Sequence, residues 1–100
     1  MREFILVDPA DLYLPPGIRS QGADPKKLAR QIAQFGSSLD RIPALELIRG
    51  KDGHLRINDG VTRATRVAKL RPGELILAEV IATFDGLDVT RTPRVGEVLP

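Results

Sequence analysis

The chain has 100 residues, which is the usual size of one domain and leaves room for a single small core. Hydrophobic residues make up 42% of it and charged residues 28%, a composition typical of a folded chain and not of a disordered one. With 15 basic and 13 acidic residues, the formal charge of +2 is too small to argue for nucleic-acid binding by itself.

Cysteine is absent, which excludes disulfide bonds, thiolate metal sites and a cysteine nucleophile. No apolar run approaches the roughly 18–20 residues of a membrane span, and the first residues lack the apolar stretch of a secretory signal. A cytoplasmic protein without a membrane partner is therefore expected.

The first part of the chain predicts a strand followed by a constrained loop. Residues 4–7 form a continuous apolar tetrad, which is typical of a short buried strand. Several prolines disfavour helix over residues 8–23. Arg19 and Ser20 lie on this loop, so they are candidate binding residues, although an ordinary solvated loop explains them as well.

A first helix is predicted from Pro25 to Gly36. Asp24 is a preferred N-cap residue, Pro25 suits the first helical position, and Gly36 suits the C-terminal cap. Apolar residues recur at helical spacing along one side. The opposite side is expected to face solvent and carries Lys26, Lys27, Arg30 and Gln34.

The second half predicts a hairpin, a helix and a central strand. Residues 44–49 and 54–58 read as two strands joined by a turn that contains Asp-Gly. A helix is expected over residues 60–70, where Arg71-Pro72-Gly73 ends it. Residues 75–82 are apolar at nearly every position, which indicates a central strand buried on both faces.

These elements predict an α/β (α+β) fold in which a small single-layer mixed sheet carries two main helices. The domain is expected to cover residues 1–84. Residues 85–100 form a C-terminal tail in which apolar residues recur at neither helical nor strand spacing. A frayed terminus is the favoured interpretation of this tail. An edge strand near residues 89–92, or a docking segment, is the alternative.

The segment from Asn58 to Arg66 carries the most chemistry. A strand runs into Gly60, where a positive φ or a close backbone approach is expected, and a helix then begins. The free amides at a helix N-terminus attract anions, and Arg63 in the first turn is unfavourable there unless an anion compensates it. Arg66 follows on the same side. The predicted anion site comprises Asn58, Gly60, Thr62, Arg63 and Arg66, with Arg19 and Ser20 from the loop.

An ordinary explanation competes evenly with this one: Asp59 caps the helix and the arginines are solvated. Capping is the favoured role of Asp59. Its alternatives, which make it the one candidate catalytic residue, are to hold a divalent cation beside a phosphate or to act as a general base. His54 is expected at the surface, and no phosphate-binding P-loop, zinc motif or Ser-His-Asp arrangement is present.

In this order, the elements resemble the ParB/sulfiredoxin-like superfamily over roughly residues 4–82. The resemblance rests on an N-terminal strand, a proline loop with arginine, a helix ending in glycine, a strand-turn-strand and a Gly-x-x-Arg helix. The corresponding residues are Phe4–Val7, Leu14–Arg19–Ser20, Pro25–Gly36, Pro43–Asn58 and Gly60-Val61-Thr62-Arg63. The resemblance implies that nucleotide phosphates, from ATP or CTP with Mg²⁺, are held by Gly60 and Arg63 while Arg19 closes over them.

The Gly60–Arg63 turn departs from both best-known branches of that family. Sulfiredoxins place a cysteine inside this turn, and its absence here excludes sulfinic-acid reduction. ParB proteins have Gly-Glu-Arg-Arg, whereas Val61 and Thr62 stand at the two middle positions of this chain.

Three functions follow as hypotheses. The leading one is a stand-alone domain that binds a nucleotide or another phosphate-bearing ligand at Gly60–Arg63. The second is a metal-dependent phosphotransferase or nuclease that uses Asp59. The third is an interaction module for nucleic acid or a partner protein, in which the basic helix face of Lys26, Lys27 and Arg30 acts together with the irregular C-terminal tail. A homodimer is also among the expected assemblies.

Overall fold

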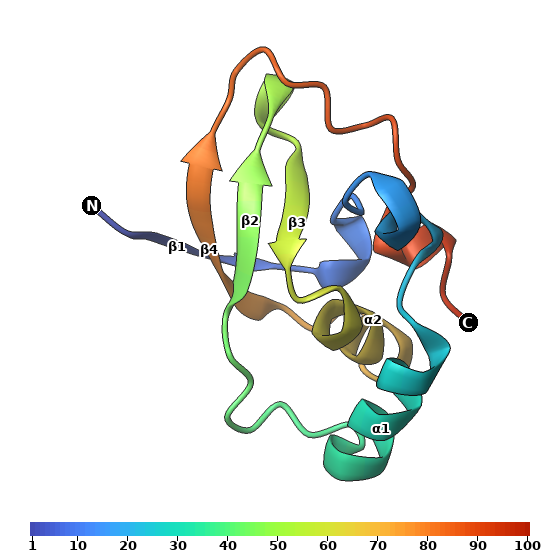
Figure 1. The fold of residues 1–100 in the computed structure, drawn as a ribbon. Coiled ribbons are helices and arrows are strands. Elements are labelled where there is room, and N and C mark those ends of the chain that lie inside the picture. The colour runs from blue at the N-terminus through green and yellow to red at the C-terminus, as the bar shows by residue number, and fades with distance from the viewer.

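A four-stranded mixed sheet with two helices forms the framework of the molecule (Figure 1). The computed structural model describes all residues 1–100. The strands are β1 (Glu3–Val7), β2 (Leu45–Arg49), β3 (Leu55–Asp59) and β4 (Ile76–Thr83), and the helices are α1 (Pro25–Phe35) and α2 (Val61–Leu70). The predicted fold class, a small mixed sheet with two main helices, is confirmed.

The strand order is β1-β4-β2-β3, so β4 is an inner strand as its apolar sequence predicts. It pairs antiparallel with β1 and parallel with β2, while β2 and β3 form the predicted antiparallel hairpin. One expectation for β4 is wrong. Leu77 and Ile81 are 48% and 45% exposed because helices cover only one face of the sheet.

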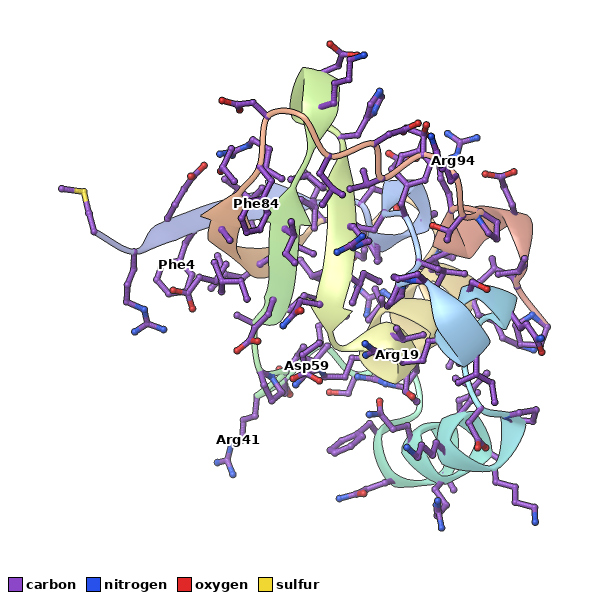
Figure 2. All side chains as sticks on the ribbon, turned by 45° about the horizontal axis from the view of Figure 1, so that its top comes forward. Phe4, Arg19, Arg41, Asp59, Phe84 and Arg94 are labelled. Atoms are coloured by element: carbon purple, nitrogen blue, oxygen red, sulfur yellow. The ribbon has the colours of Figure 1, made fainter.

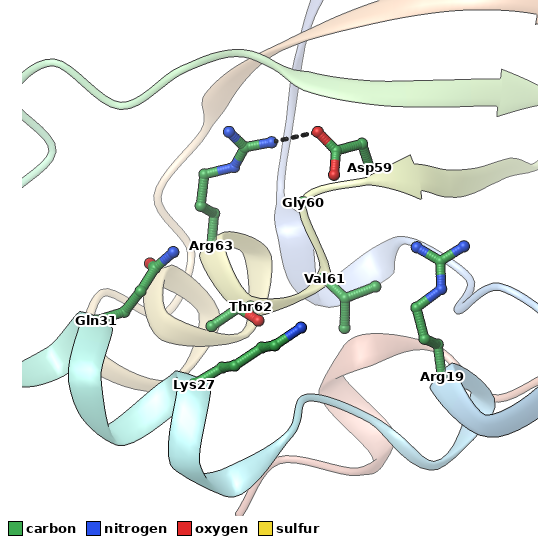
Figure 3. A pocket seen from close by; sticks show the side chains of 8 residues that line it. All are labelled: Arg19, Lys27, Gln31, Asp59, Gly60, Val61, Thr62 and Arg63. Atoms are coloured by element: carbon green, nitrogen blue, oxygen red, sulfur yellow. Dashed lines mark hydrogen bonds and ion pairs between the residues drawn. The ribbon is translucent and has the colours of Figure 1, made fainter.

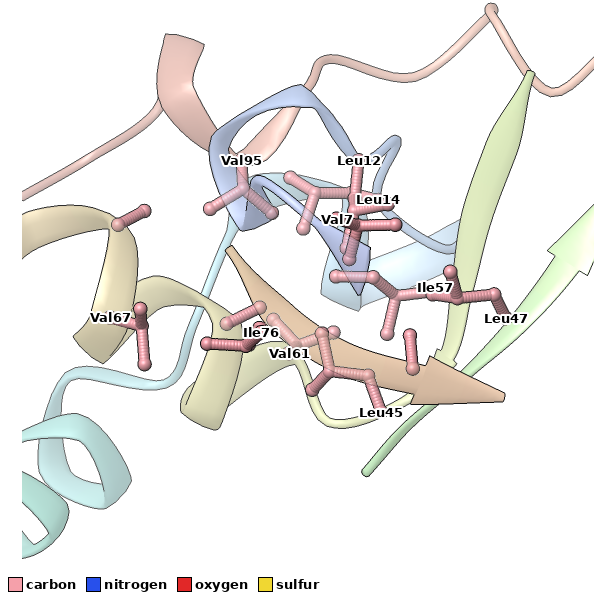
Figure 4. Packing of buried hydrophobic residues seen from close by; sticks show 13 residues of the cluster. Val7, Leu12, Leu14, Leu45, Leu47, Ile57, Val61, Val67, Ile76 and Val95 are labelled. Atoms are coloured by element: carbon pink, nitrogen blue, oxygen red, sulfur yellow. The ribbon is translucent and has the colours of Figure 1, made fainter. Parts of the chain in front are cut away.

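Thirteen buried side chains form the core between the sheet and α2 (Figure 4). Leu45, Leu47 and Ile57 project from the β2–β3 hairpin and are fully buried. From the helix, Ala64 and Ala68 face this core, and these small residues let α2 lie close to the strands. The N-terminus of α2 is thereby held directly at the end of β3.

Helix α1 packs against α2 and not on the sheet itself. Its start is fixed by the predicted cap, because the Asp24 carboxylate accepts hydrogen bonds from the backbone amides of Lys26 (2.8 Å) and Lys27 (3.2 Å). At its other end Gly36 has a φ of 55°. The cap therefore fixes where α1 begins, and the packing against α2 fixes which of its sides is covered.

The last residues dock against the body of the domain and do not fray. Val95 is 1% exposed and belongs to the core, and its backbone amide donates to the Leu12 carbonyl at 2.9 Å. The Leu14 amide likewise donates to the Pro93 carbonyl at 3.0 Å. There is no strand over residues 89–92. The segment is held by isolated buried valines, which leave no periodic pattern in the sequence.

Neither helix has the length and apolar character that crossing a membrane requires.

Candidate anion-binding site

Gly60 makes the turn between β3 and α2. It is the N-cap of α2, with φ 112° and ψ 24°, a conformation that side-chain-bearing residues rarely adopt. A Cβ placed there would lie 2.5 Å from Cδ2 of Leu45 and 2.9 Å from Nη2 of Arg63. Glycine is therefore needed both for the turn and for the close approach of the Arg63 guanidinium to the backbone.

Asp59 does not cap α2, so the favoured interpretation of this residue is wrong. It ends β3 opposite Glu46, and no side chain accepts a hydrogen bond at the start of the helix. The Asp59 carboxylate instead pairs with Nη2 of Arg63 at 3.2 Å. Because Asp59 keeps a strand conformation, its side chain is directed to the guanidinium, and the first amides of α2 are left without a side-chain partner.

A hollow of about 260 Å³ opens at this helix N-terminus (Figure 3). Three elements form it: the β3–α2 turn, helix α1, and a short 3-10 turn over Gly17–Gln21 in the proline loop. The lining residues are Arg19, Lys27, Gln31, Asp59, Gly60, Val61, Thr62 and Arg63.

The charges around the hollow favour an anion. Arg19, Lys27 and Arg63 contribute three cations, and Asp59 is the single carboxylate. Val61 is the one hydrophobic lining residue and is itself mostly in the core. A small, polar, cationic hollow at a helix N-terminus is suited to phosphate oxygens, which accept hydrogen bonds from amides, hydroxyls and guanidiniums alike.

Arg19 reaches the site from the opposite side, as its loop position suggests. Its Nη1 donates to the backbone carbonyl of Asn58 at 3.2 Å, so the loop and the end of β3 are tied together. Figure 2 shows Arg19 and Asp59 on the same side of the molecule, and the close view places Arg19 across the hollow from Arg63 (Figure 3).

Three predicted site residues lie outside the hollow. Arg66 is 2% exposed and donates to the carbonyls of Gly36 (2.9 Å) and Ser38 (2.8 Å), and burial lowers the pKa of its guanidinium. The Ser20 hydroxyl donates a hydrogen bond to the Gly17 carbonyl in the same 3-10 turn. The side-chain amide of Asn58 contacts Glu46 at 3.4 Å. Arg66 thus joins α2 to the end of α1 and does not face the ligand position.

Lys27 and Gln31 line the hollow but are not among the residues of the site predicted from the sequence. Both project from α1 into the hollow. Lys27 is exposed, as the predicted solvated face requires, but its side chain also lines the hollow. A signal for them exists: each directly precedes a residue of the apolar stripe, Leu28 or Ile32. Residues at the border of such a stripe lie beside the neighbouring helix once the stripe is packed.

The site therefore combines a glycine turn, uncapped helix amides and cations from three separate elements. Comparison of the chain with protein-family models, curated proteins and solved structures finds no match.

Proposed function

We propose that the chain is a binding module, ParB/sulfiredoxin-like in its arrangement, that holds a nucleotide or another phosphate-bearing ligand at the N-terminus of α2. The observation that carries this proposal is the convergence of Arg19, Lys27 and Arg63 on helix amides that no side chain caps. Three cations brought together from separate elements repel one another, and a bound anion relieves that repulsion.

Each group has a separate task in this proposal. The amides that follow Gly60 and the hydroxyl of Thr62 donate to phosphate oxygens. Arg63 and Arg19 bind the phosphate from two sides, where the planar guanidinium suits bidentate contacts, and Lys27 contributes a mobile point charge. Asp59 is the one carboxylate in the wall, so a magnesium ion would be held jointly by it and by the phosphates of ATP or CTP.

Calorimetric titration with ATP, CTP, ADP and inorganic pyrophosphate, with and without Mg²⁺, tests the proposal. Lys27→Met should weaken binding about tenfold, since a charge-assisted hydrogen bond contributes about 1.5 kcal/mol or more. Lys26→Met is the matched control, because Lys26 has the same charge on the same helix turn but does not line the hollow. It should bind within about twofold of wild type at equal ionic strength.

Two results would contradict the proposal. One is the absence of binding heat with every ligand, at more than one temperature. The other is an equal loss in the Lys26→Met and Lys27→Met variants, since a general charge effect would then replace a specific site.

A metal-dependent phosphotransferase or nuclease is the second candidate, and the position of Asp59 in the wall of the hollow favours it. In that case release of phosphate or cleavage of nucleic acid should require Mg²⁺ or Mn²⁺ and should be lost in Asp59→Asn. Turnover that survives this substitution removes Asp59 from the mechanism.

A further inference from the structure

Large apolar side chains gather on the face of the sheet that the helices leave uncovered. Most of the exposed large hydrophobic residues lie on β1, on β4 or next to their ends, with exposures from 45% to 64% apart from the terminal Met1. We call the following six residues the outer sheet face: Phe4, Leu6, Leu75, Leu77, Ile81 and Phe84. Figure 2 shows Phe4 and Phe84 at the β1–β4 end of the molecule, remote from α1.

The strand register places these residues together. Across the β1–β4 ladder Phe4 lies opposite Glu79 and Leu6 opposite Leu77, while the alternate pair Val7 and Ile76 faces the core. Because successive side chains of a strand point to opposite faces, Leu75, Leu77 and Ile81 lie on the side of Phe4 and Leu6. The register of β4 against β2 shifts at Ile81, and Phe84 follows the end of β4 after this shift.

The outer sheet face is more apolar than a sheet face that contacts only water. An antiparallel ribbon with one solvated face normally alternates apolar residues inside with polar residues outside. Here the outward positions are apolar, with Glu79 between them. The Glu79 carboxylate is paired with Arg2 at 2.9 Å, and the Arg2 guanidinium lies 4.9 Å from the centre of the Phe4 ring. Contiguous apolar patches of this kind mark interaction surfaces.

We propose that the outer sheet face is the interface of a two-fold dimer of this chain. Six side chains that are each about half exposed present roughly 500–600 Å² of apolar surface, and a stable interface buries about 800 Å² per partner. The rim, which includes the exposed Arg2, accounts for the rest. The patch is therefore large enough for the centre of a dimer interface.

Charge favours a second copy over other occupants. Within this face Glu79 is paired with Arg2. On the same side of the sheet, the register places Glu46 next to Glu79 and Arg56 next to Ile48, so the border of the face carries both signs of charge. A rim with both signs of charge can match itself around a two-fold axis, where the acidic side of one copy meets the basic side of the other. An anionic lipid surface is bound by a cluster of basic residues beside apolar ones, whereas the border of this face carries both signs of charge.

Sedimentation velocity of the full chain tests the proposal at concentrations from about 1 µM to about 1 mM. The wild-type mass should rise from one copy to two over this range. Leu77→Glu should remain at the mass of one copy throughout, because a charge would be buried at the centre of the interface. Leu6→Lys is the second variant and should behave in the same way.

Ile18→Glu is the matched control, since Ile18 is 84% exposed on the proline loop and lies outside the outer sheet face. It should dimerise like wild type. Circular dichroism should show all three variants folded, because each position is already about half exposed or more. A wild-type chain that stays at one copy up to the highest concentration overturns the proposal. So does a Leu77→Glu variant that dimerises normally, or a monomer that sediments with phosphatidylcholine vesicles.

Discussion

Two arginines one turn apart on α2 have different roles. Arg63 keeps 17% of its side chain exposed and lines the hollow, whereas Arg66 is buried and donates to two backbone carbonyls beyond the end of α1. Helical spacing correctly puts them on one side of α2. Helical spacing cannot show that the Arg66 guanidinium donates to the carbonyls of Gly36 and Ser38, because these two residues belong to the segment after α1.

Substitution of Arg66 should therefore change stability more than binding, since its one contact with a residue of the hollow is the hydrogen bond from Nε to Gln31 Oε1 at 3.3 Å. Arg66→Met leaves the two carbonyls without their donor, so the free energy of unfolding should fall by about 2–3 kcal/mol. Arg63→Met should leave the unfolding free energy nearly unchanged and weaken ligand binding. Urea unfolding and calorimetry on both variants check this. A large loss of stability in Arg63→Met together with normal stability in Arg66→Met would contradict the assignment.

Asp59 should oppose metal-free anion binding. In the free protein it neutralises Arg63, and an incoming phosphate competes with it for the same guanidinium. Asp59→Asn should tighten the binding of inorganic pyrophosphate without Mg²⁺ by up to about fivefold. This factor corresponds to the free energy of up to about 1 kcal/mol that an exposed ion pair contributes. Asp85→Asn, in the exposed loop after β4, is the control and should leave the affinity unchanged. Weaker metal-free binding in Asp59→Asn would contradict this role.

At the scale of elements, the sequence predicts nearly all of the secondary structure. Asp24-Pro25 and Gly36 delimit α1, and Gly60 separates β3 from α2, because caps and turns depend on single residue types. The orientation of α1 is less predictable. Periodicity identifies its buried stripe but not the element next to it, so it correctly predicts an exposed Lys27 but cannot show that this side chain lines the hollow.

The cap of α1 should titrate in acid. Hydrogen bonds from the Lys27 and Lys26 amides lower the pKa of Asp24 below its usual value. A carboxyl group with a lowered folded-state pKa stabilises the fold above its unfolded pKa of about 3.9, and this contribution is lost as the pH falls through the folded value.

Asp24→Asn removes this titration but keeps a residue that caps well. The melting temperature of wild type should exceed that of Asp24→Asn near about pH 6, and the difference should vanish near about pH 2. Thermal unfolding followed by circular dichroism at several pH values measures it. A difference that stays constant over this range would show that the Asp24 charge is not involved.

At the scale of the whole molecule, three features are beyond what local sequence patterns can show. The outer sheet face follows from the placement of both helices on one side, which the apolar pattern of β4 does not indicate. The docking of residues 85–100 depends on isolated side chains such as Val95. The third cation of the hollow, Lys27, depends on how α1 packs against α2. All three are properties of tertiary contacts.

The docked C-terminal segment should contribute to global stability. Val95 is 1% exposed, so Val95→Ala should lower the free energy of unfolding by about 1–3 kcal/mol through lost apolar burial and a small cavity. Leu99→Ala, at a position that is 38% exposed, should stay within about 0.5 kcal/mol of wild type. Equal unfolding curves for Val95→Ala and wild type would show that the segment does not pack as described.

The most direct test of the central claim, that the N-terminus of α2 binds phosphate, is an amide chemical-shift titration of the labelled protein with inorganic pyrophosphate. The largest shifts should fall on the amides of residues 60–63, with smaller ones near Arg19 and Lys27, because helix amides donate directly to the ligand. Shifts confined to other surfaces, or no shifts at the highest pyrophosphate concentration, would contradict phosphate binding at the N-terminus of α2.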